Sequence, residues 1–329
     1  MPRQARLDLP GLVHHVMARG IEGREIFKDN KDRELFLKRL ANIFSDSGAP
    51  TLYAWALIPN HFHLLIRPAA THLSTVMQRL MTGYAVNFNR QNNRKGHLFQ
   101  NRYKSIVVEE DSYFLELIRY IHMNPVRAGL VSSVEQLADY SFAGHAVIMG
   151  KRKYPIQNID DVLAMFSTKR SEAIGRYQEF VAEGIGHGTR KDLQGGGLIR
   201  SSGGITALLA RNSEEHEAAD DRILGSGEFV EMVLNTHKKE HDFHMSNVED
   251  VLQNVATMSG LSREQIVGLG RNRDVSKARR EFYRRAQEEA GASMALLGRM
   301  TGRAHMSVAR AIQRAKREGE RNVKGQQGA

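Results

Sequence analysis

The chain has 329 residues, a formal net charge of +10 and no cysteine. The missing thiols exclude a disulfide framework and a thiolate metal site, which fits a reducing cytoplasm. The first residues lack the apolar core of a signal peptide, no apolar run is long enough to span a bilayer, and no Walker-type glycine loop indicates ATP or GTP. We therefore expect a soluble, cytoplasmic protein without a membrane partner, and the length favours two or three domains.

Residues 1–150 predict one domain of mixed strands and helices. Alternating or apolar stretches predict strands, and apolar spacings of three and four predict helices. In chain order these are a strand at 12–19, a helix at 31–44 with Phe36, Leu37, Leu40 and Ile43 on one stripe, two strands within 53–66, a helix at 73–89, a strand at 103–108 and a helix at 112–123. This order suggests an α+β, ferredoxin-like fold with a single antiparallel sheet, helices on one side and the site on the sheet face.

The motif His61-Phe62-His63 lies in the second of two strands separated by a turn at Pro59-Asn60. Successive side chains of a strand alternate between faces, so we expect both histidines on one face and Phe62 on the other. Two adjacent imidazoles suit a divalent metal ion. Two ligands do not complete a site, however, and strand histidines that bind no ligand are the alternative.

Tyr120 and Asn124 lie one helical turn apart at the end of the helix at 112–123, for which Asp111 is the expected N-cap and Pro125 the stop. The amide oxygen of Asn124 could complete the coordination begun by the histidines and so bring the Tyr120 hydroxyl beside a metal-held phosphate. A tyrosine hydroxyl, with a pKa of about 10, needs such a cation to attack phosphorus at neutral pH. The alternative is that Tyr120 is an ordinary half-buried aromatic residue.

Four ordered stretches together resemble one known family. They are residues 10–20, followed by Ile26-Phe27, and residues 59–63, 96–105 and 120–131, within a region of roughly 8 to 148. They resemble the single-tyrosine HUH transposases of the insertion-sequence-200 type, most closely the REP-associated tyrosine transposase branch. Four motifs in the expected order are far more specific than any one of them.

The resemblance implies a metal-dependent nuclease and strand transferase for single-stranded DNA beside a hairpin. His61 and His63 would hold Mg²⁺ or Mn²⁺, Asn124 would occupy the position of the third, amide-type ligand, and Tyr120 would attack DNA to leave a 5′-phosphotyrosine and a free 3′-hydroxyl. An amide at the third position can also serve by orienting water. We further expect four cations to face phosphates, with solvated surface charge as the alternative; they are Arg102, Lys104, Arg119 and Arg127.

Residues 151–247 predict a helical hairpin and a connector. Apolar residues within 160–184 predict two packed helices, residues 184–204 are rich in glycine, and a short helix is predicted at 229–235. The histidines between His237 and His244 match no standard metal spacing, and we interpret them as surface residues.

Residues 248–318 predict a basic DNA-binding domain, and residues 319–329 a disordered tail. From residue 271 onward there are fifteen Lys or Arg against six Asp or Glu, a charge suited to duplex DNA. Residues 292–314 predict a helix-turn-helix, preceded by a basic helix at 275–289, that resembles the one in the bacterial replication initiator; a basic three-helix bundle without groove contact is the alternative. The expected buried seam is Leu296, Leu297, Met300, Val308 and Ile312, and the expected DNA-contacting residues are Arg303, His305, Ser307, Arg310, Gln313 and Arg314.

The sequence leaves two main functional classes and a third, less favoured one. The favoured class is the tyrosine transposase, which acts on single-stranded hairpin DNA and also binds duplex DNA. The second is a domesticated, non-catalytic relative that acts as a repressor or architectural factor at repeated sites, and the third is a metal phosphoesterase that uses water. The sequence decides neither the target DNA nor monomer against homodimer.

Overall fold

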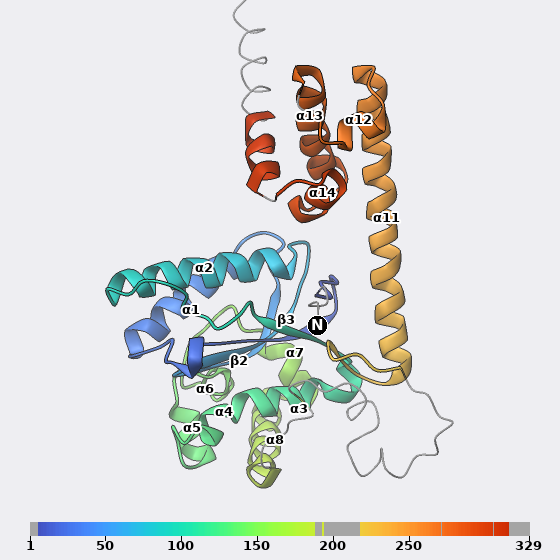
Figure 1. Cartoon of the computed structure of the whole chain (residues 1–329). Coiled ribbons are helices and arrows are strands. Elements are labelled where there is room, and N and C mark those ends of the chain that lie inside the picture. The colour runs from blue at the N-terminus through green and yellow to red at the C-terminus, as the bar shows by residue number, and fades with distance from the viewer. Residues whose placement is uncertain (1–5, 188–192, 194–217, 271, 305, 316–329) are drawn as a thin grey trace, which may run out of the picture. The chain divides into compact units, whose positions relative to one another are not determined.

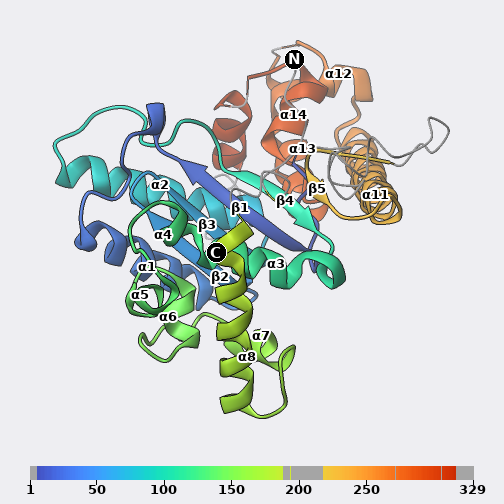
Figure 2. The same cartoon turned by 90° about the horizontal axis from the view of Figure 1, so that it is seen from below.

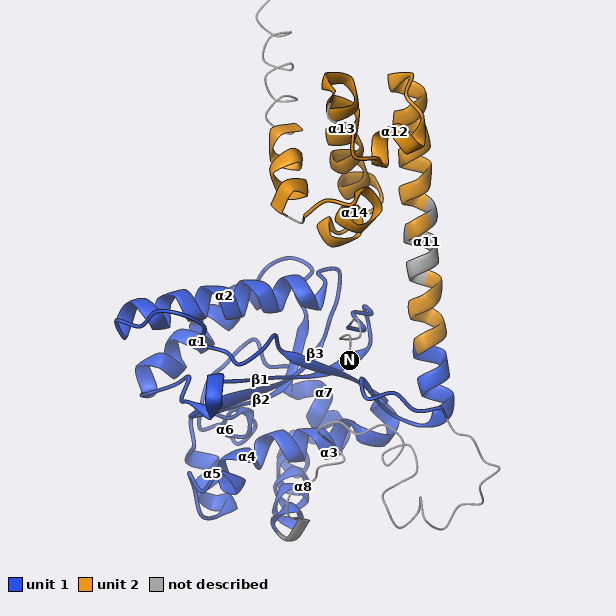
Figure 3. Cartoon of the chain, in the orientation of Figure 1, with its two compact units in different colours: residues 1–233 blue, residues 234–329 orange. Residues whose placement is uncertain are grey.

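The computed structural model describes residues 6–187, 193, 218–270, 272–304 and 306–315 (Figure 1). The chain divides into two compact units, Met1–Val233 and Leu234–Ala329 (Figure 3). No helix in these described ranges is long and apolar enough to cross a membrane.

Unit 1 is built on a five-stranded sheet with the strand order β2-β3-β1-β4-β5. The strands are β1 (Val13–Arg19), β2 (Thr51–Ile58), β3 (His61–Arg67), β4 (Lys104–Val108) and β5 (Ile223–Leu224). β1 to β4 pair in antiparallel fashion, as expected, whereas β5 joins the edge in parallel with β4. The α+β class is confirmed. The parallel edge strand was not predicted, because two residues are too few to show the alternation of a strand.

Helices cover both faces of this sheet, not one face as the sequence suggested (Figures 1 and 2). α1 (Asn30–Phe44) and α2 (Leu73–Gln91) pack on one face, and α3 (Glu110–His122) packs on the other with α7 (Ile159–Ala164) and α8 (Arg170–Glu183). The reason lies in β2 and β3, whose apolar side chains are buried on both sides of the sheet. Short helices α4 (Asn124–Arg127), α5 (Val134–Asp139) and α6 (Gly144–Ile148) link α3 to this second layer.

The two apolar cores explain how the strands present the site. The predicted stripe of α1, including Phe36 and Leu40, packs in the first core with Phe62, Leu64 and Ile66 of β3. Alternation along β3 therefore turns His61 and His63 toward the opposite face, which is the face that α3 covers. The apolar residues of β3 in the first core orient the histidines, and the second core holds α3 against the same face of the sheet. Tyr120 and the histidines therefore lie close together.

The predicted N-cap of the tyrosine helix is wrong by two residues. α3 follows Glu109, and Asp111 lies in its first turn. The Glu109 carboxylate accepts hydrogen bonds from the backbone amide and the hydroxyl of Ser226, at 3.0 and 2.9 Å. The side chain of Glu109 makes no local capping hydrogen bond and instead contacts Ser226, which is far away in the chain. This contact could not be predicted from local sequence.

The predicted helical hairpin within 160–184 is present as α7 and α8. Its apolar residues, among them Val162, Leu163 and Tyr177, pack into the second core, so the hairpin belongs to unit 1. Of the glycine-rich connector, residues 184–187 form a 3-10 helix, whereas residues 188–192 and 194–204 lie outside the described residues. The predicted tail at 319–329 lies outside them as well.

Unit 2 is helical. α11 (Gly227–Ser259), which begins in unit 1, contains the short helix predicted at 229–235 but has a total length of 33 residues. α12 (Arg263–Val267), α13 (Arg273–Glu289), α14 (Met294–Thr301) and a helix at 306–315 complete the unit. The predicted seam is confirmed, with Leu297, Val308 and Ile312 buried and Leu296 and Met300 partly buried. Gly302 ends α14 in the left-handed region, at φ 62°, which lets the chain turn at once into the last helix.

Candidate active site

The antiparallel register of β1 and β3 brings a third histidine to the predicted pair. Met17 of β1 is opposite His63, so His15, two residues earlier on the same face, lies beside it. The His15 Nε2 and the His63 Nδ1 are 2.9 Å apart, and their rings stack with centroids 5.1 Å apart. The sequence analysis did not predict a role for His15. Alternation along residues 12–19 predicts which face of the strand His15 is on, but the contact with His63 depends on how β1 pairs with β3.

The hydrogen bonds of the site leave one nitrogen of each predicted ligand available for coordination. The His61 Nδ1 lies 2.6 Å from the Asn60 Oδ1, which can only accept, so His61 donates from Nδ1 and keeps a lone pair on Nε2. The His63 Nδ1 is engaged with the His15 Nε2, and Nε2 of His63 keeps its lone pair in the tautomer in which His63 is the donor of this bond. Side chains that engage Nδ1 in this way fix the tautomer and the ring orientation that a metal-binding histidine needs.

Electrostatics hold these imidazoles neutral. Burial, helped by the charge of Arg19, lowers the pKa of His61 to about 4. Burial also lowers the pKa of His63 well below 6.5, with His15, His61 and Arg127 acting in the same direction. A neutral imidazole is the form that binds a metal ion, so this environment suits coordination at neutral pH.

Tyr120 lies against the histidines from α3. Its ring centroid is 5.8 Å from that of His63 and 6.0 Å from that of His15, in edge-on contact, and only 2% of the residue is exposed. The Arg127 guanidinium carbon lies 4.8 Å from the Tyr120 ring centroid, and Arg127 donates to the Tyr120 carbonyl at 2.8 Å. We call His15, His63 and Tyr120 the first cluster.

Asn124 contacts the backbone of the tyrosine helix. Its Nδ2 donates to the carbonyls of Tyr120, at 2.9 Å, and Ile121, at 3.3 Å. The amide nitrogen is thus used to close the end of α3, and Oδ1 is the atom that could ligate. In the described part of the chain no group of three or more His, Asp or Glu side chains is arranged for a metal ion, so further ligands would be amide, water or substrate oxygens.

The predicted cations of unit 1 fall into two groups. Arg102 and Lys104 are exposed and line a depression of about 430 Å³ together with Arg19, Gln100, Asn101 and the predicted histidines. Arg119 is different, because it is only 6% exposed, pairs with Glu116 and lies over the ring of Phe180 at 4.2 Å. The expectation that Arg119 faces phosphate is therefore corrected: the side chain ties α3 to α8.

A second cluster, made of His122, His145 and Tyr177, lies within the second core. The Tyr177 hydroxyl is 2.7 Å from the Nδ1 of both His122 and His145, and all three residues are fully buried. One hydroxyl proton can be donated to only one imidazole, so the two histidines adopt opposite tautomers. Burial lowers the pKa of His145 to about 4 and raises that of Tyr177 well above 10.

In unit 2, a hollow of about 560 Å³ lies between α13 and the helix at 306–315. Five of the residues expected to contact DNA line it, whereas the sixth, His305, lies outside the described residues. The five are Arg303, Ser307, Arg310, Gln313 and Arg314. Ser276, Arg279, Arg280 and Tyr283 of α13 join them, and the described lining residues include no carboxylate. Arg279 itself is buried and donates to backbone carbonyls, including Ile266 and Gly268 at 2.6 Å each.

Comparison with known proteins covers the first of these sites. Residues 9–124 match the family model described as "Transposase IS200 like". This region contains His15, His61, His63, Tyr120 and Asn124, so the similarity to this family includes the candidate active site of unit 1.

A search of the solved structures also found a similarity. A solved structure entitled "Structure of the REP associates tyrosine transposase bound to a REP hairpin" is 18% identical, with 48% of this chain and 91% of that chain covered and a TM-score of 0.38. A search of the curated proteins found no match.

Proposed function

We propose that unit 1 nicks and rejoins single-stranded DNA beside a hairpin, through a covalent bond between Tyr120 and a 5′-phosphate. The observation that carries this proposal is the approach of the Tyr120 ring to within 5.8 Å of His63, whose second nitrogen remains available. The family match of residues 9–124 supports the same activity. Residues 1–150 would be the catalytic domain, with α7, α8 and β5 as its support.

The residues present fit a divalent ion. Two neutral imidazoles with engaged Nδ1 atoms, His61 and His63, would bind it through Nε2, and the Asn124 Oδ1 is the candidate third ligand. Mg²⁺ or Mn²⁺ would polarise the phosphate when bound and stabilise its developing charge. His15 acts through His63 and is therefore a positioning residue.

The chain's own groups supply the other parts of the reaction. The Tyr120 hydroxyl loses its proton as its oxygen forms a bond to phosphorus. The bond from phosphorus to the 3′-oxygen breaks, and that oxygen takes up one proton and leaves as a 3′-hydroxyl. Arg127 lies over the tyrosine ring and adds positive charge where negative charge accumulates. The energy of the broken ester is retained in the phosphotyrosine, so rejoining needs no nucleotide cofactor.

The test uses labelled hairpin oligonucleotides with single-stranded flanks, with and without Mg²⁺ or Mn²⁺, and denaturing electrophoresis to detect a protein–DNA adduct. We expect a metal-dependent adduct that Tyr120→Phe removes. Tyr113→Phe is the control, since Tyr113 lies on the same helix and is partly buried, whereas Tyr120 is buried. Metal-dependent cutting that survives Tyr120→Phe would identify water as the nucleophile, and binding without an adduct would favour the non-catalytic DNA-binding protein.

We also propose that unit 2, residues 248–318 in particular, binds duplex DNA. The cluster of arginines without a carboxylate in the hollow between α13 and the helix at 306–315 supports this. Arg310→Gln and Arg314→Gln are expected to weaken binding to a duplex and to lower its salt dependence, measured by fluorescence anisotropy. Arg299→Gln, at an exposed position outside the hollow, is the control. Equal effects of all three changes would contradict the assignment of the hollow.

A further inference from the structure

Arg19 lies at the end of β1, on the sheet face that carries the predicted metal ligands. It is opposite His61 in the register of β1 and β3, just as Met17 is opposite His63. The two residues of such a pair point to the same face of a sheet, and Arg19 lines the depression that contains both histidines. Its charge is close enough to lower the pKa of His61. An exposed guanidinium therefore lies beside the candidate metal site.

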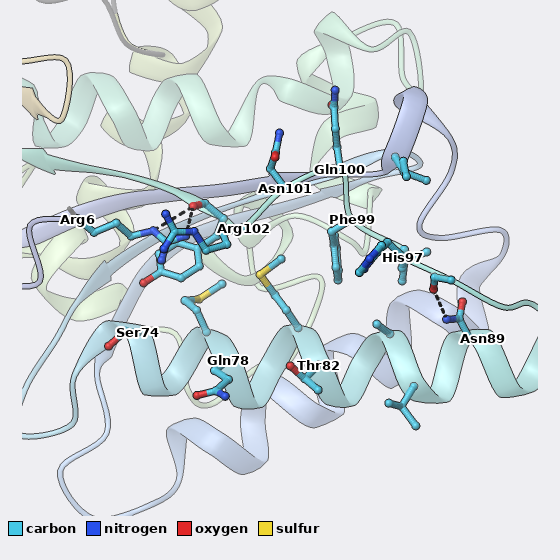
Figure 4. A pocket seen from close by; sticks show the side chains of 18 residues that line it. Arg6, Ser74, Gln78, Thr82, Asn89, His97, Phe99, Gln100, Asn101 and Arg102 are labelled. Atoms are coloured by element: carbon cyan, nitrogen blue, oxygen red, sulfur yellow. Dashed lines mark hydrogen bonds between the residues drawn. The ribbon is translucent and has the colours of Figure 1, made fainter. Parts of the chain in front are cut away.

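The backbone around Arg19 is held by the segment at 98–100. The Gln100 amide donates to the Arg19 carbonyl at 2.9 Å. Just beyond the strand, the Ile21 amide donates to the Leu98 carbonyl at 3.0 Å. Figure 4 shows Gln100 pointing away from α2, and its side chain lines the depression together with Arg19. These bonds fix the end of β1 at the edge of the depression.

The turn that follows β1 supports the guanidinium. A Cβ atom at Gly23 would lie between 3.4 and 3.9 Å from three atoms of the Arg19 guanidinium, so this group packs against the backbone of the turn. The Asn60 Nδ2 donates to the Gly23 carbonyl at 3.2 Å, and the Asn60 Oδ1 accepts from the His61 Nδ1 at 2.6 Å. One side chain, that of Asn60, therefore holds both the turn beneath Arg19 and the ring of a predicted metal ligand.

The donors of this guanidinium are not used within the described part of the protein. Among the described residues Arg19 forms no side-chain hydrogen bond and no ion pair, whereas the neighbouring Arg24 pairs with Glu22 at 2.8 Å. The described lining of the depression also contains no carboxylate that could neutralise the charge. A planar cation with available donors suits a phosphate ester, which offers oxygen acceptors on several sides.

The positions of Tyr120 and Arg19 give this cation a particular place in the reaction. The Tyr120 ring contacts His15 and His63. Arg19 is instead opposite His61 and lies roughly 13 Å along β1 from His15. The candidate nucleophile and the guanidinium are therefore toward opposite ends of the histidine pair. In-line displacement places the leaving oxygen on the side of phosphorus away from the nucleophile, which is the end where Arg19 lies.

We propose that Arg19 is a catalytic residue that stabilises the leaving 3′-oxygen when Tyr120 attacks the DNA strand. This role rests on the proposed nicking activity and adds a group to it. The Tyr120 oxygen bonds to phosphorus and its proton passes to water, while the bond from phosphorus to the 3′-oxygen breaks. Arg19 donates hydrogen bonds to that oxygen as negative charge develops on it, and a proton from water completes the 3′-hydroxyl. Arg19 keeps its own protons, because a guanidinium is not deprotonated in proteins.

The test compares two labelled hairpin oligonucleotides with single-stranded flanks that differ in one atom. One has the natural 3′-oxygen at the phosphate that the parent protein cleaves, and the other has sulfur in its place. A thiolate leaves with little stabilisation, because a thiol has a far lower pKa than an alcohol. With Mn²⁺ and the natural strand, we expect Arg19→Ala to lower the rate of adduct formation about 100-fold or more. With the sulfur strand, the rate should lie within about fivefold of the parent rate.

Three comparisons support the interpretation of these rates. Arg24→Ala is the matched control, since Arg24 is an exposed arginine of the same turn outside the lining of the depression, and it should react like the parent with both strands. Arg19→Lys keeps the charge without the planar fork and should recover only part of the rate with the natural strand. Guanidinium ions added to Arg19→Ala should restore part of it as well, and should have no such effect on Arg24→Ala.

Two further measurements separate a catalytic from a structural or ligand-orienting role. In the full chain carrying Tyr120→Phe, which prevents turnover, Arg19→Ala should change the affinity for the natural hairpin less than about threefold. The Mn²⁺ concentration for half-maximal adduct formation should also stay the same. Equal losses of rate with both strands, or a raised Mn²⁺ requirement that accounts for the loss, would overturn the role of Arg19 and leave nicking intact. Absence of an adduct between the parent protein and either strand would refute nicking and this role together.

Discussion

Unit 1 contains two clusters of two histidines and one tyrosine, and their hydrogen bonds make them different kinds of site. In the second cluster both imidazoles bond to the Tyr177 hydroxyl, and every member is fully buried. In the first cluster His15 bonds to His63, and the depression beside His63 opens toward exposed cations. The same three side chains can therefore form a structural joint or a candidate reaction centre, depending on where their hydrogen-bonding atoms are used.

The largest expected difference between the clusters concerns their tyrosines. Tyr120→Phe is expected to lower adduct formation by about three orders of magnitude or more, because the nucleophile is removed. Tyr177→Phe should keep the adduct within severalfold and lower the free energy of unfolding by about 2 kcal/mol, because two buried nitrogens lose their partner. Quantitative adduct assays and urea denaturation measure the two effects. If Tyr120→Phe and Tyr177→Phe are equally well folded and lose the adduct to the same extent, the distinction between a reaction centre and a structural joint is wrong.

The second prediction concerns His15. Removal of a residue that orients a ligand typically weakens metal binding about 10- to 100-fold. We expect His15→Ala to raise by that factor the Mn²⁺ concentration needed for half-maximal adduct formation, with the rate at saturating Mn²⁺ less affected. His15→Gln, which can accept a hydrogen bond from the His63 Nδ1, should recover part of the loss. A His15→Ala variant with unchanged metal dependence would show that the contact has no role in coordination.

The third prediction uses pH to examine the second cluster. Burial lowers the pKa of His145 from 6.5 to about 4. Between these two pH values the imidazole is therefore neutral in the folded state and protonated in the unfolded state. The stabilisation is complete above pH 6.5 and is lost as the pH falls toward 4, which amounts to about 2 kcal/mol between pH 7 and 5. His145→Gln cannot titrate and should flatten the pH dependence of unfolding by this amount. A slope identical to that of the parent would contradict the depressed pKa.

The smallest expected effect concerns the cations at the rim of the first cluster. Arg102→Gln and Lys104→Gln should each weaken single-strand binding about two- to threefold and reduce the salt slope by about 0.7 for each phosphate that is no longer neutralised. Arg119→Gln should instead affect stability, since Arg119 is buried between α3 and α8. Binding measured over a range of salt concentrations separates these cases, and a salt slope changed only by Arg119→Gln would reverse the assignment.

Much of the first cluster could be predicted because its signals are local. Alternation along β3 gave the common face of His61 and His63, and helical spacing gave the position of Tyr120. His15 could not be assigned from sequence, because its contact depends on the register between β1 and β3, which are separated by α1 and β2. Arg119 was misjudged for a similar reason, since its partner ring, Phe180, lies 61 positions away in the chain.

Element ends were predicted less well than element types. α11 was expected to end at 235 because its apolar pattern weakens there, yet nothing in the sequence stops a helix before Gly260, whose φ is +66°. A break in amphipathic pattern can therefore reflect a change of surroundings and not the end of a helix. Helices on both sheet faces were foreseeable from the unbroken apolar run in β2, which lacks the alternation of a strand exposed on one side.

One helix serves both clusters, since Tyr120 and His122 stand two residues apart on α3 and so point to opposite sides of it. The joint around Tyr177 therefore fixes the rotation of the helix that carries the candidate nucleophile. Among relatives that keep this tyrosine, positions 122, 145 and 177 are expected to vary together: a change at one is tolerated when the other two change with it, although 55 residues separate the first from the last.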